Sequence, residues 1–158
     1  MEHKRQIDNK KLVDMLKKAY ADEWIAGYYY LYIGYFVKGP FSEDIEELFN
    51  EVAKEELEEH TKMLADRLQQ LGEDPPSDFK SLWDLSPCKF PEVPSDPYNT
   101  QGLLKAGVLA EECAMKAYKE LYDYVHGVDP VTEEVARHLL ADETEHRTKF
   151  ENMMVKQS

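Results

Sequence analysis

The segment DETEHRTKF (residues 142–150) places a carboxylate, Glu143, three residues before an imidazole, His146. His146 shares one face of the expected helix with four apolar residues. These are Val135, Leu139, Phe150 and Met153. A charged group on a core-facing turn is unfavourable unless it is paired or bound to a metal ion. Taken alone, the segment fits either an ordinary buried histidine or half of a metal site.

Glycine and proline divide the rest of the chain into four long segments. The breakers are GP (39–40), GEDPP (72–76) and GVDP (127–130). We expect helices at about residues 8–38, 43–71, 100–126 and 130–156, with no strand, because no stretch alternates with a period of two. The sequence therefore predicts an all-α protein with a single domain over residues 1–158.

The first and third segments carry the apolar stripe of a bundle helix, and each stripe is interrupted by one glutamate. In the first segment the glutamate is Glu23, and Tyr30 follows seven residues later. In the third it is Glu111, followed at the same distance by Tyr118. The chain therefore looks like two related helix pairs, each contributing an acid to the core.

The second segment holds His60 on its apolar face, but its spacing differs from that of the fourth. The residue three positions before His60 is Leu57, and the nearest preceding carboxylate is Glu56, four positions back. In an α-helix Glu56 lies about 40° from His60 around the axis, whereas Glu59 points away. We select Glu56 as the ligand candidate. Asp142 has the four-residue spacing in the fourth segment and is a reserve ligand or a partner that orients a histidine.

The proline-rich stretch at about residues 72–99 is too long for an ordinary connection in a compact domain. One kind of four-helix bundle requires it, because its second and third helices are joined by a crossover along the whole bundle. A helix of about 28 residues is about 42 Å long, and about 13 extended residues cover that distance. We therefore predict a four-helix bundle with a crossover between the second and third helices.

Four carboxylates and two imidazoles then converge in one core. The set is Glu23, Glu56, His60, Glu111, Glu143 and His146. Four carboxylic acids are tolerable there only if they are protonated, face water or bind cations. Two divalent ions balance four carboxylates, and oxygen-rich coordination with two imidazoles suits iron or manganese. A metal-free structural bundle is the remaining alternative.

The composition limits the partners. The chain has 158 residues and a net charge of −13, which disfavours binding to nucleic acid. A small basic N-terminus is the exception to this acidic character. Its residues are Lys4, Arg5, Lys10 and Lys11. No apolar run approaches the roughly 20 residues of a membrane span, and the first residues lack a signal-peptide core. We expect a cytoplasmic protein.

Two cysteines, Cys88 and Cys113, are too few for a disulfide scaffold. Cys88 falls about halfway along the crossover and Cys113 lies two residues after Glu111. The pair therefore has room to meet near the buried acids. It is either a redox pair or two inert buried thiols.

Three motifs resemble the ferritin-like superfamily: ADEWIAGYYY (21–30), LAEECAMKAY (109–118) and DETEH (142–146). Within that superfamily the chain is similar to the Dps-like proteins called thioferritins. The resemblance implies a bacterioferritin-type di-iron site made by the six residues above, with Cys88 and Cys113 as a cysteine pair beside it. It also implies a homo-oligomeric cage of twelve subunits.

The expected function is a ferroxidase that oxidises Fe(II) with hydrogen peroxide or oxygen and stores Fe(III), which protects against oxidative stress. Two iron ions per subunit are expected, with manganese as an alternative metal and no haem. Tyr30, Tyr118 and Asp142 are candidates for contacts to the ligands. The alternatives are a rubrerythrin-like peroxidase without storage, although the chain has no CxxC motif, and a Dps-type DNA-protecting protein.

Overall fold

The computed structural model describes residues 5–157, and Lys4 of the basic N-terminus lies outside this range. The described chain is all-α, as predicted. Its elements are α1 (Asn9–Phe36), α2 (Ser42–Lys54), the π-helix η1 (Glu55–His60), α3 (Thr61–Gln70), α4 (Phe79–Leu85), α5 (Thr100–Val125) and α6 (Pro130–Gln157). Each of the four predicted helical ranges is occupied by a helical rod, and α2, η1 and α3 together form the second.

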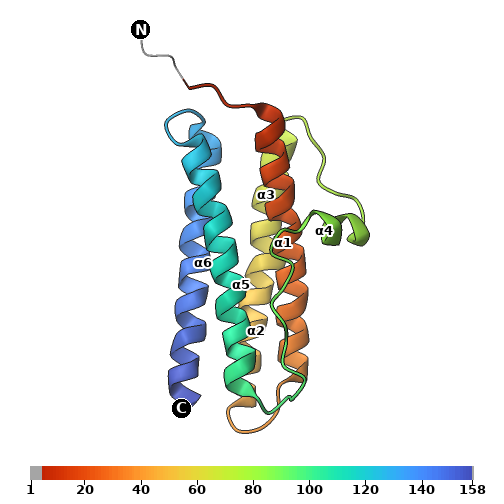
Figure 1. Cartoon of the computed structure of the whole chain (residues 1–158), viewed down its shortest axis with the longest axis vertical. Helices are drawn as coiled ribbons and strands as arrows, with labels where there is room; N and C mark the ends of the chain where they lie inside the picture. Colours follow the sequence, from red (N-terminus) through yellow and green to blue (C-terminus); the bar gives the residue numbers. More distant parts are fainter. Residues whose placement is uncertain (1–4, 158) are drawn as a thin grey trace.

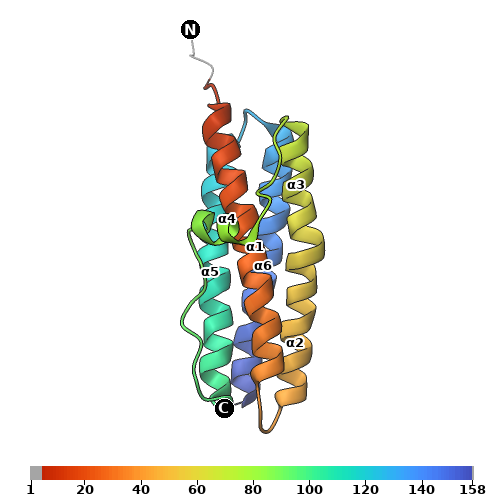
Figure 2. The same ribbon diagram turned by 90° about the vertical axis from the view of Figure 1, so that its right-hand side faces the viewer.

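The four rods form a bundle (Figures 1 and 2). The chain descends through α1, returns through α2, η1 and α3, and then runs back along the outside of the bundle before α5 ascends and α6 descends. The crossover between the second and third rods therefore spans the bundle, as predicted. It also contains α4, which the sequence reasoning did not anticipate and which lies against α1 at mid-height. The side chain of Asp78 caps α4 by accepting a hydrogen bond from the backbone N–H of Ser81.

Polar side chains fix the beginnings of the long helices. Asp8 accepts hydrogen bonds from two backbone N–H groups at the start of α1, and Asn99 accepts one at the start of α5. Asp129 accepts from the backbone N–H groups of Val131 and Thr132 at the start of α6. Each cap satisfies a donor that the first helical turn leaves without a partner. These caps set where each rod begins, and so which residues reach mid-height.

The second rod departs from the expected uninterrupted α-helix. In η1 the backbone N–H of Thr61 bonds to the carbonyl of Glu56, five residues earlier, which is the pattern of a π-helix. Such a turn holds one residue more than an α-helical turn. Its Leu57 packs over Gly27 of α1, where a Cβ atom would overlap the leucine side chain. Gly27 thus provides the space that the wider turn needs.

The buried apolar side chains form two clusters rather than one. One cluster includes Tyr30, Phe49 and Phe150, and the other includes Leu16 and Leu68. Along every rod, a buried acid or histidine separates the residues of the first cluster from those of the second. The bundle therefore has a polar layer at mid-height between two apolar cores. No helix in residues 5–157 is both long and apolar enough to cross a membrane.

Candidate metal centre

The polar layer contains all six residues that the sequence singled out as ligands. Glu23, Glu56, His60, Glu111, Glu143 and His146 are each at most 2% exposed. They form two groups whose nitrogen and oxygen atoms lie within 4.8 Å of one another. The first group is Glu23, Glu56, His60 and Glu143, and the second is Glu56, Glu111, Glu143 and His146. Glu56 and Glu143 belong to both groups, so the arrangement has the form of two adjacent sites with two shared carboxylates.

Both histidines turn Nδ1 toward this layer. Nδ1 of His60 is 2.9 Å from Glu143 and 3.3 Å from Glu23. Nδ1 of His146 is 3.1 Å from Glu56 and 3.5 Å from Glu111. These distances permit strong charge interactions between imidazoles and carboxylates, and they place one nitrogen donor in each group.

Several of the facing atoms are close together without being aligned for hydrogen bonds. In the described part of the chain, four of them have no hydrogen-bond partner: Glu56 Oε1, Glu111 Oε2, Glu143 Oε1 and His146 Nδ1. Buried polar atoms are normally satisfied, so a cluster of unsatisfied ones points to a missing ligand. Inward-facing carboxylate oxygens and imidazole nitrogens fit divalent iron or manganese.

Outer carboxylates hold the far sides of both imidazoles. Nε2 of His60 lies 2.8 Å from Asp142 on α6, and Nε2 of His146 lies 2.8 Å from Glu55 on η1. Such contacts fix the ring orientation, so that Nδ1 is the atom offered to the centre. The contact of Asp142 with His60 agrees with one of the two roles predicted for it, that of a partner that orients a histidine, and this role stays a prediction.

Glu55 is the site residue that the sequence reasoning missed. If Leu57 is left out, EELEEH (55–60) aligns with DETEH (142–146), and Glu55 then corresponds to Asp142. The internal duplication therefore contained the signal. The π-turn places the extra residue at this position, so the four-residue step from Glu56 to His60 approaches the geometry of the three-residue step in α6.

The two tyrosines that follow the seam glutamates donate hydrogen bonds across the bundle. Tyr30 of α1 donates to Glu111 of α5 over 2.7 Å, and Tyr118 of α5 donates to Glu23 of α1. Burial raises the pKa of both phenols well above the usual value, and nearby carboxylates such as Glu143 reinforce the shift. Both hydroxyls therefore remain protonated donors.

Without cations, the layer holds protons. Burial raises the pKa of Glu111 well above its usual range, and the charge of Glu143 adds to the effect. Burial alone would lower the pKa of His60, but the carboxylates of Glu143 and Glu56 outweigh it and raise the pKa to about 12. The pKa of His146 is raised in the same way, chiefly by Glu111 and Glu143 against the effect of burial. Divalent cations would displace these protons.

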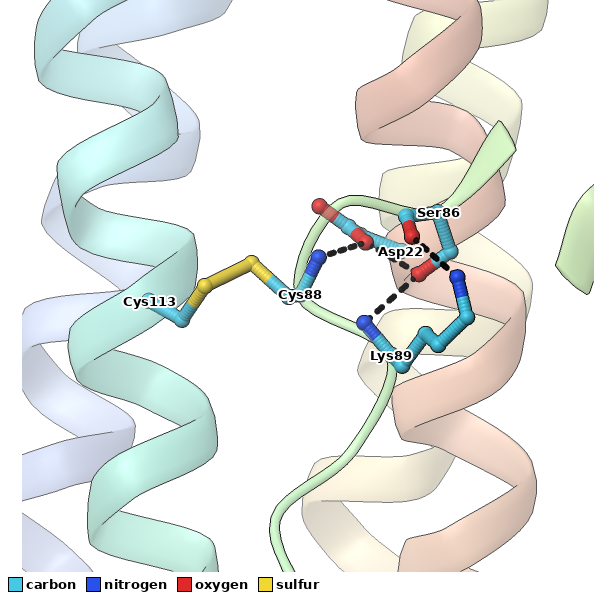
Figure 3. Close-up of a disulfide and its surroundings, with 5 residues drawn as sticks. All are labelled: Asp22, Ser86, Cys88, Lys89 and Cys113. Carbon is cyan, nitrogen blue, oxygen red and sulfur yellow. Dashed lines mark hydrogen bonds between the residues drawn. A yellow bond between two sulfur atoms is a disulfide. The ribbon is translucent and has the colours of Figure 1, made fainter. Parts of the chain in front are cut away.

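Cys88 and Cys113 form a disulfide that joins the crossover to α5 (Figure 3). The two cysteines are therefore bonded to each other in the structure, and their role as a redox pair stays a prediction. Asp22 of α1 holds the crossover from the other side, because it accepts hydrogen bonds from the Ser86 hydroxyl and from the backbone N–H of Cys88. Burial raises the pKa of Asp22 to about 6 despite these hydrogen bonds.

A small cavity connects the disulfide segment with the polar layer. Its volume is about 20 Å³, and its lining includes Cys88, Lys89, Glu23, Glu56 and Tyr118. Alanines from α1 and α5 form much of the remaining wall. A space of this size accommodates about one water-sized molecule.

The family model of the ferritin-like domain matches residues 13–157 of this chain. The chain belongs to the ferritin-like family. A relative from Pyrococcus furiosus, called DNA protection during starvation protein, is 34% identical over 148 residues, which cover 94% of this chain and 79% of the relative.

Solved structures show the same fold. The bacterioferritin-related protein from Bacteroides fragilis, described as a dodecameric thioferritin, has a TM-score of 0.89 and 33% identity, over 95% of this chain and 88% of that chain. Dps from Thermosynechococcus elongatus has a TM-score of 0.82 and 16% identity, over 92% and 90% of the two chains. The predicted resemblance to ferritin-like and Dps-like proteins is confirmed.

Proposed function

We propose that this protein is a ferroxidase that oxidises Fe(II) with hydrogen peroxide, or with oxygen, and retains Fe(III) inside a homo-oligomeric cage. The observation that carries the proposal is the pair of buried ligand groups that share Glu56 and Glu143. The negative charges of four carboxylates balance the positive charges of two Fe(II) substrate ions. Membership of a family of iron-binding proteins supports iron over manganese.

In this proposal each residue has a defined task. Glu23 and His60 bind one iron, Glu111 and His146 bind the other, and Glu56 and Glu143 contact both. Tyr30 and Tyr118 orient the two unshared carboxylates. Asp142 and Glu55 hold the imidazoles so that their Nδ1 atoms face the metal.

The proposed reaction is a two-electron reduction of the oxidant. Two Fe(II) ions each give one electron to hydrogen peroxide, its O–O bond breaks, and two protons complete two water molecules. Pairing the two ions matters because a single Fe(II) would supply one electron and release a hydroxyl radical. The protons held by the metal-free layer leave when iron binds, so the polar layer exchanges protons for iron.

We further propose that Cys88 and Cys113 are redox-active. The disulfide lies beside the cavity that reaches Glu23 and Glu56. If an external dithiol reductant opens the disulfide, the pair holds two electrons, which is the number that one peroxide molecule requires. This proposal assigns the cysteines an accessory role, since the six ligands complete the oxidation of iron without them.

Assembly and location are part of the proposal. The similar protein from Bacteroides fragilis is described as dodecameric, and we propose the same cage for this chain in the cytoplasm. Sedimentation of the purified protein tests the assembly. Iron retention separates storage from a rubrerythrin-like peroxidase, because a cage that stores mineral retains far more than about two ions per subunit.

DNA protection is a second candidate because the relative from Pyrococcus furiosus is named for it. The net charge of −13 opposes binding to a phosphate backbone. Two of the basic residues also have contacts within the bundle: Arg5 donates to the backbone carbonyl of Asp123, and the Lys11 ammonium lies 4.6 Å from the Tyr124 ring centre. We expect no gel shift at physiological salt, with or without residues 1–11.

The test of the main proposal compares two neighbouring glutamates on α5. Glu111 is buried in the layer, whereas Glu112 is exposed. Protein loaded anaerobically with about two Fe(II) per subunit is mixed with peroxide, and formation of Fe(III) is followed by absorbance. The Glu111→Ala variant should lose the fast oxidation and the Glu112→Ala variant should keep it. Equal rates in both variants would refute the proposed centre.

A further inference from the structure

A second cavity lies between α1 and the beginning of the crossover, apart from the polar layer. Its volume is about 160 Å³. Figure 2 shows α4 lying across α1 at this place. None of the six ligand candidates lines the cavity. Its lining includes Tyr20, Trp24, Pro76, Asp78, Phe79 and Leu82.

Three aromatic side chains border this space, which we call the aromatic cavity. Tyr20 and Trp24 of α1 have ring centres 6.3 Å apart and ring planes at 70°, so they present differently oriented surfaces to one volume. Phe79 comes from α4 and is 80% exposed, which leaves its ring available to a ligand. The face of an aromatic ring carries partial negative charge and attracts cations, most strongly in tryptophan.

The charge at the edge of the aromatic cavity has the same sign. Asp78 is the only charged residue in its lining, and no lysine, arginine or histidine lines it. The backbone N–H and the hydroxyl of Ser81 each donate a hydrogen bond of 2.9 Å to the Asp78 carboxylate. These bonds fix the carboxylate and lower the pKa of Asp78 from its usual value, so the group is ionised at neutral pH. An anionic ligand is therefore disfavoured.

The protein's own cations leave the three rings free. In residues 5–157, the lysine and arginine groups that lie over aromatic rings do so at Tyr122, Tyr124 and Trp83. The last of these is the Lys89 ammonium, 5.3 Å from the centre of the Trp83 ring on α4. None lies over a ring of the aromatic cavity, so these rings keep their attraction for a ligand.

We propose that the aromatic cavity binds a small organic cation, an alkylated ammonium ion, between the three rings and the carboxylate of Asp78. A cavity of about 150 Å³ is large enough for a benzene molecule, so one trimethylammonium group fits the available volume. A hydrated metal ion gains little from apolar walls, whereas the methyl groups of an alkylammonium ion contact the rings and spread the positive charge over their faces. The inference is independent of the ferroxidase proposal.

The test uses choline and its neutral analogue 3,3-dimethyl-1-butanol, which has the same shape without the charge. The chain has two tryptophans, so a Trp83→Phe background leaves Trp24 as the only indole in the full-length, assembled protein. Titration at constant ionic strength should quench Trp24 fluorescence saturably with choline. The neutral analogue should bind at least about tenfold more weakly, because it lacks the attraction of the charge to the rings and to Asp78.

Two variants in the same background assign the binding to the aromatic cavity. Asp78→Asn retains a capping oxygen for α4 but removes the charge, so choline should bind about threefold more weakly. Asp84→Asn, an exposed acid of α4 that does not line the cavity, is its control. Phe79→Leu replaces a ring with an aliphatic chain and should weaken binding about fivefold. Tyr35→Leu, at a position 74% exposed on α1, is the control for that change.

The outcomes separate recognition of a cation from a merely apolar hollow. Equal binding of choline and 3,3-dimethyl-1-butanol would overturn the inference, because apolar contact alone would then explain it. Unchanged choline binding in both Asp78→Asn and Phe79→Leu would also overturn it, since the cation would then bind elsewhere. An absence of saturable quenching in the assembled protein would show that the cavity does not accept a free cation. Both control variants should bind choline as the background protein does.

Discussion

The hydroxyl of Tyr30 on α1 lies 2.7 Å from a carboxylate oxygen of Glu111 on α5. Tyr118 on α5 makes the reciprocal contact to Glu23 on α1. Each tyrosine thus orients the acid of the opposite helix pair rather than its own. The two halves of the bundle are therefore linked at the centre by two equivalent hydrogen bonds, and removal of one should resemble removal of the other.

We expect Tyr30→Phe to weaken metal binding. The change leaves an oxygen of Glu111 without its donor while preserving the aromatic packing against Phe49 and Phe150. Loss of a residue that orients a metal ligand typically lowers affinity about 10- to 100-fold. Competition between the protein and a chromophoric chelator for Co(II) measures the change. Tyr118→Phe should give a similar loss, and Tyr28→Phe, at an exposed position, should give none.

Metal binding should strengthen as the pH rises from 6 to 8. The pKa of His60 is about 12 without metal, because Glu143 and Glu56 outweigh the effect of burial, so the ring carries a second proton throughout this range. Binding through Nδ1 displaces that proton, and His146 loses one in the same way. Each proton released makes the affinity rise about tenfold per pH unit.

Calorimetry in buffers of different ionisation enthalpy counts the released protons directly. We expect about two per filled centre at pH 7, one from each histidine, and a further contribution from Glu111, whose pKa burial raises. An enthalpy that is independent of the buffer would show that the imidazoles are already neutral before the metal arrives. In that case the charge balance of the layer would have to be different.

The bundle and the convergence of the six buried residues could both be predicted from the sequence, for one physical reason. Glu23 and Glu111 interrupt otherwise apolar seams, and a seam residue faces the core whatever its chemistry. Helix periodicity therefore predicts which side chains face the core and meet there, before the packing of the helices is known. The long crossover was predictable from its length and its prolines.

The remaining features depend on packing between distant segments. Leu57 of the π-turn lies over Gly27, where a Cβ atom would overlap it, and this contact between rods is one that no local pattern reveals. Similarly, α4 depends on its place against α1, and the disulfide depends on how the crossover lies beside α5. Glu55 was overlooked because an exact α-helical register was applied to a segment with one additional residue.

Gly27→Ala should destabilise the protein by about 1–3 kcal/mol, because the new methyl group would overlap the side chain of Leu57 and force it to move. Thermal unfolding measures the loss. The double variant Gly27→Ala with Leu57→Ala tests the cause, since a smaller side chain at position 57 accepts the methyl group. The double variant should be more stable than the sum of the two single changes predicts. Simple additivity would locate the strain elsewhere.

Deletion of Leu57 should convert the π-turn to regular α-helix without loss of the centre. The remaining sequence, EEEEH, has the three-residue step between carboxylate and histidine that DETEH has in α6. The stoichiometry of Co(II) binding should therefore be retained, while a crystal structure of the variant should show α-helical hydrogen bonds through the second rod. Deletion of Leu64, a fully buried residue of α3, is the comparison. It should rotate the following residues out of register and destabilise the bundle.

Asp22→Ala should make the disulfide between Cys88 and Cys113 easier to reduce. Asp22 accepts hydrogen bonds from Ser86 and from the backbone of Cys88, and so holds the crossover where Cys88 reaches α5. Without these bonds the two thiols meet less often, and loss of about 1.4 kcal/mol shifts the equilibrium toward the dithiol about tenfold. Equilibration with glutathione buffers, followed by alkylation and mass spectrometry, measures the shift. Asp22→Asn retains an acceptor and should lie near the unmodified protein, as should Asp84→Ala at an exposed position of the crossover. Equal reduction in all four proteins would mean that Cys113 and the fold alone position Cys88, and that Asp22 has no part in setting the redox equilibrium.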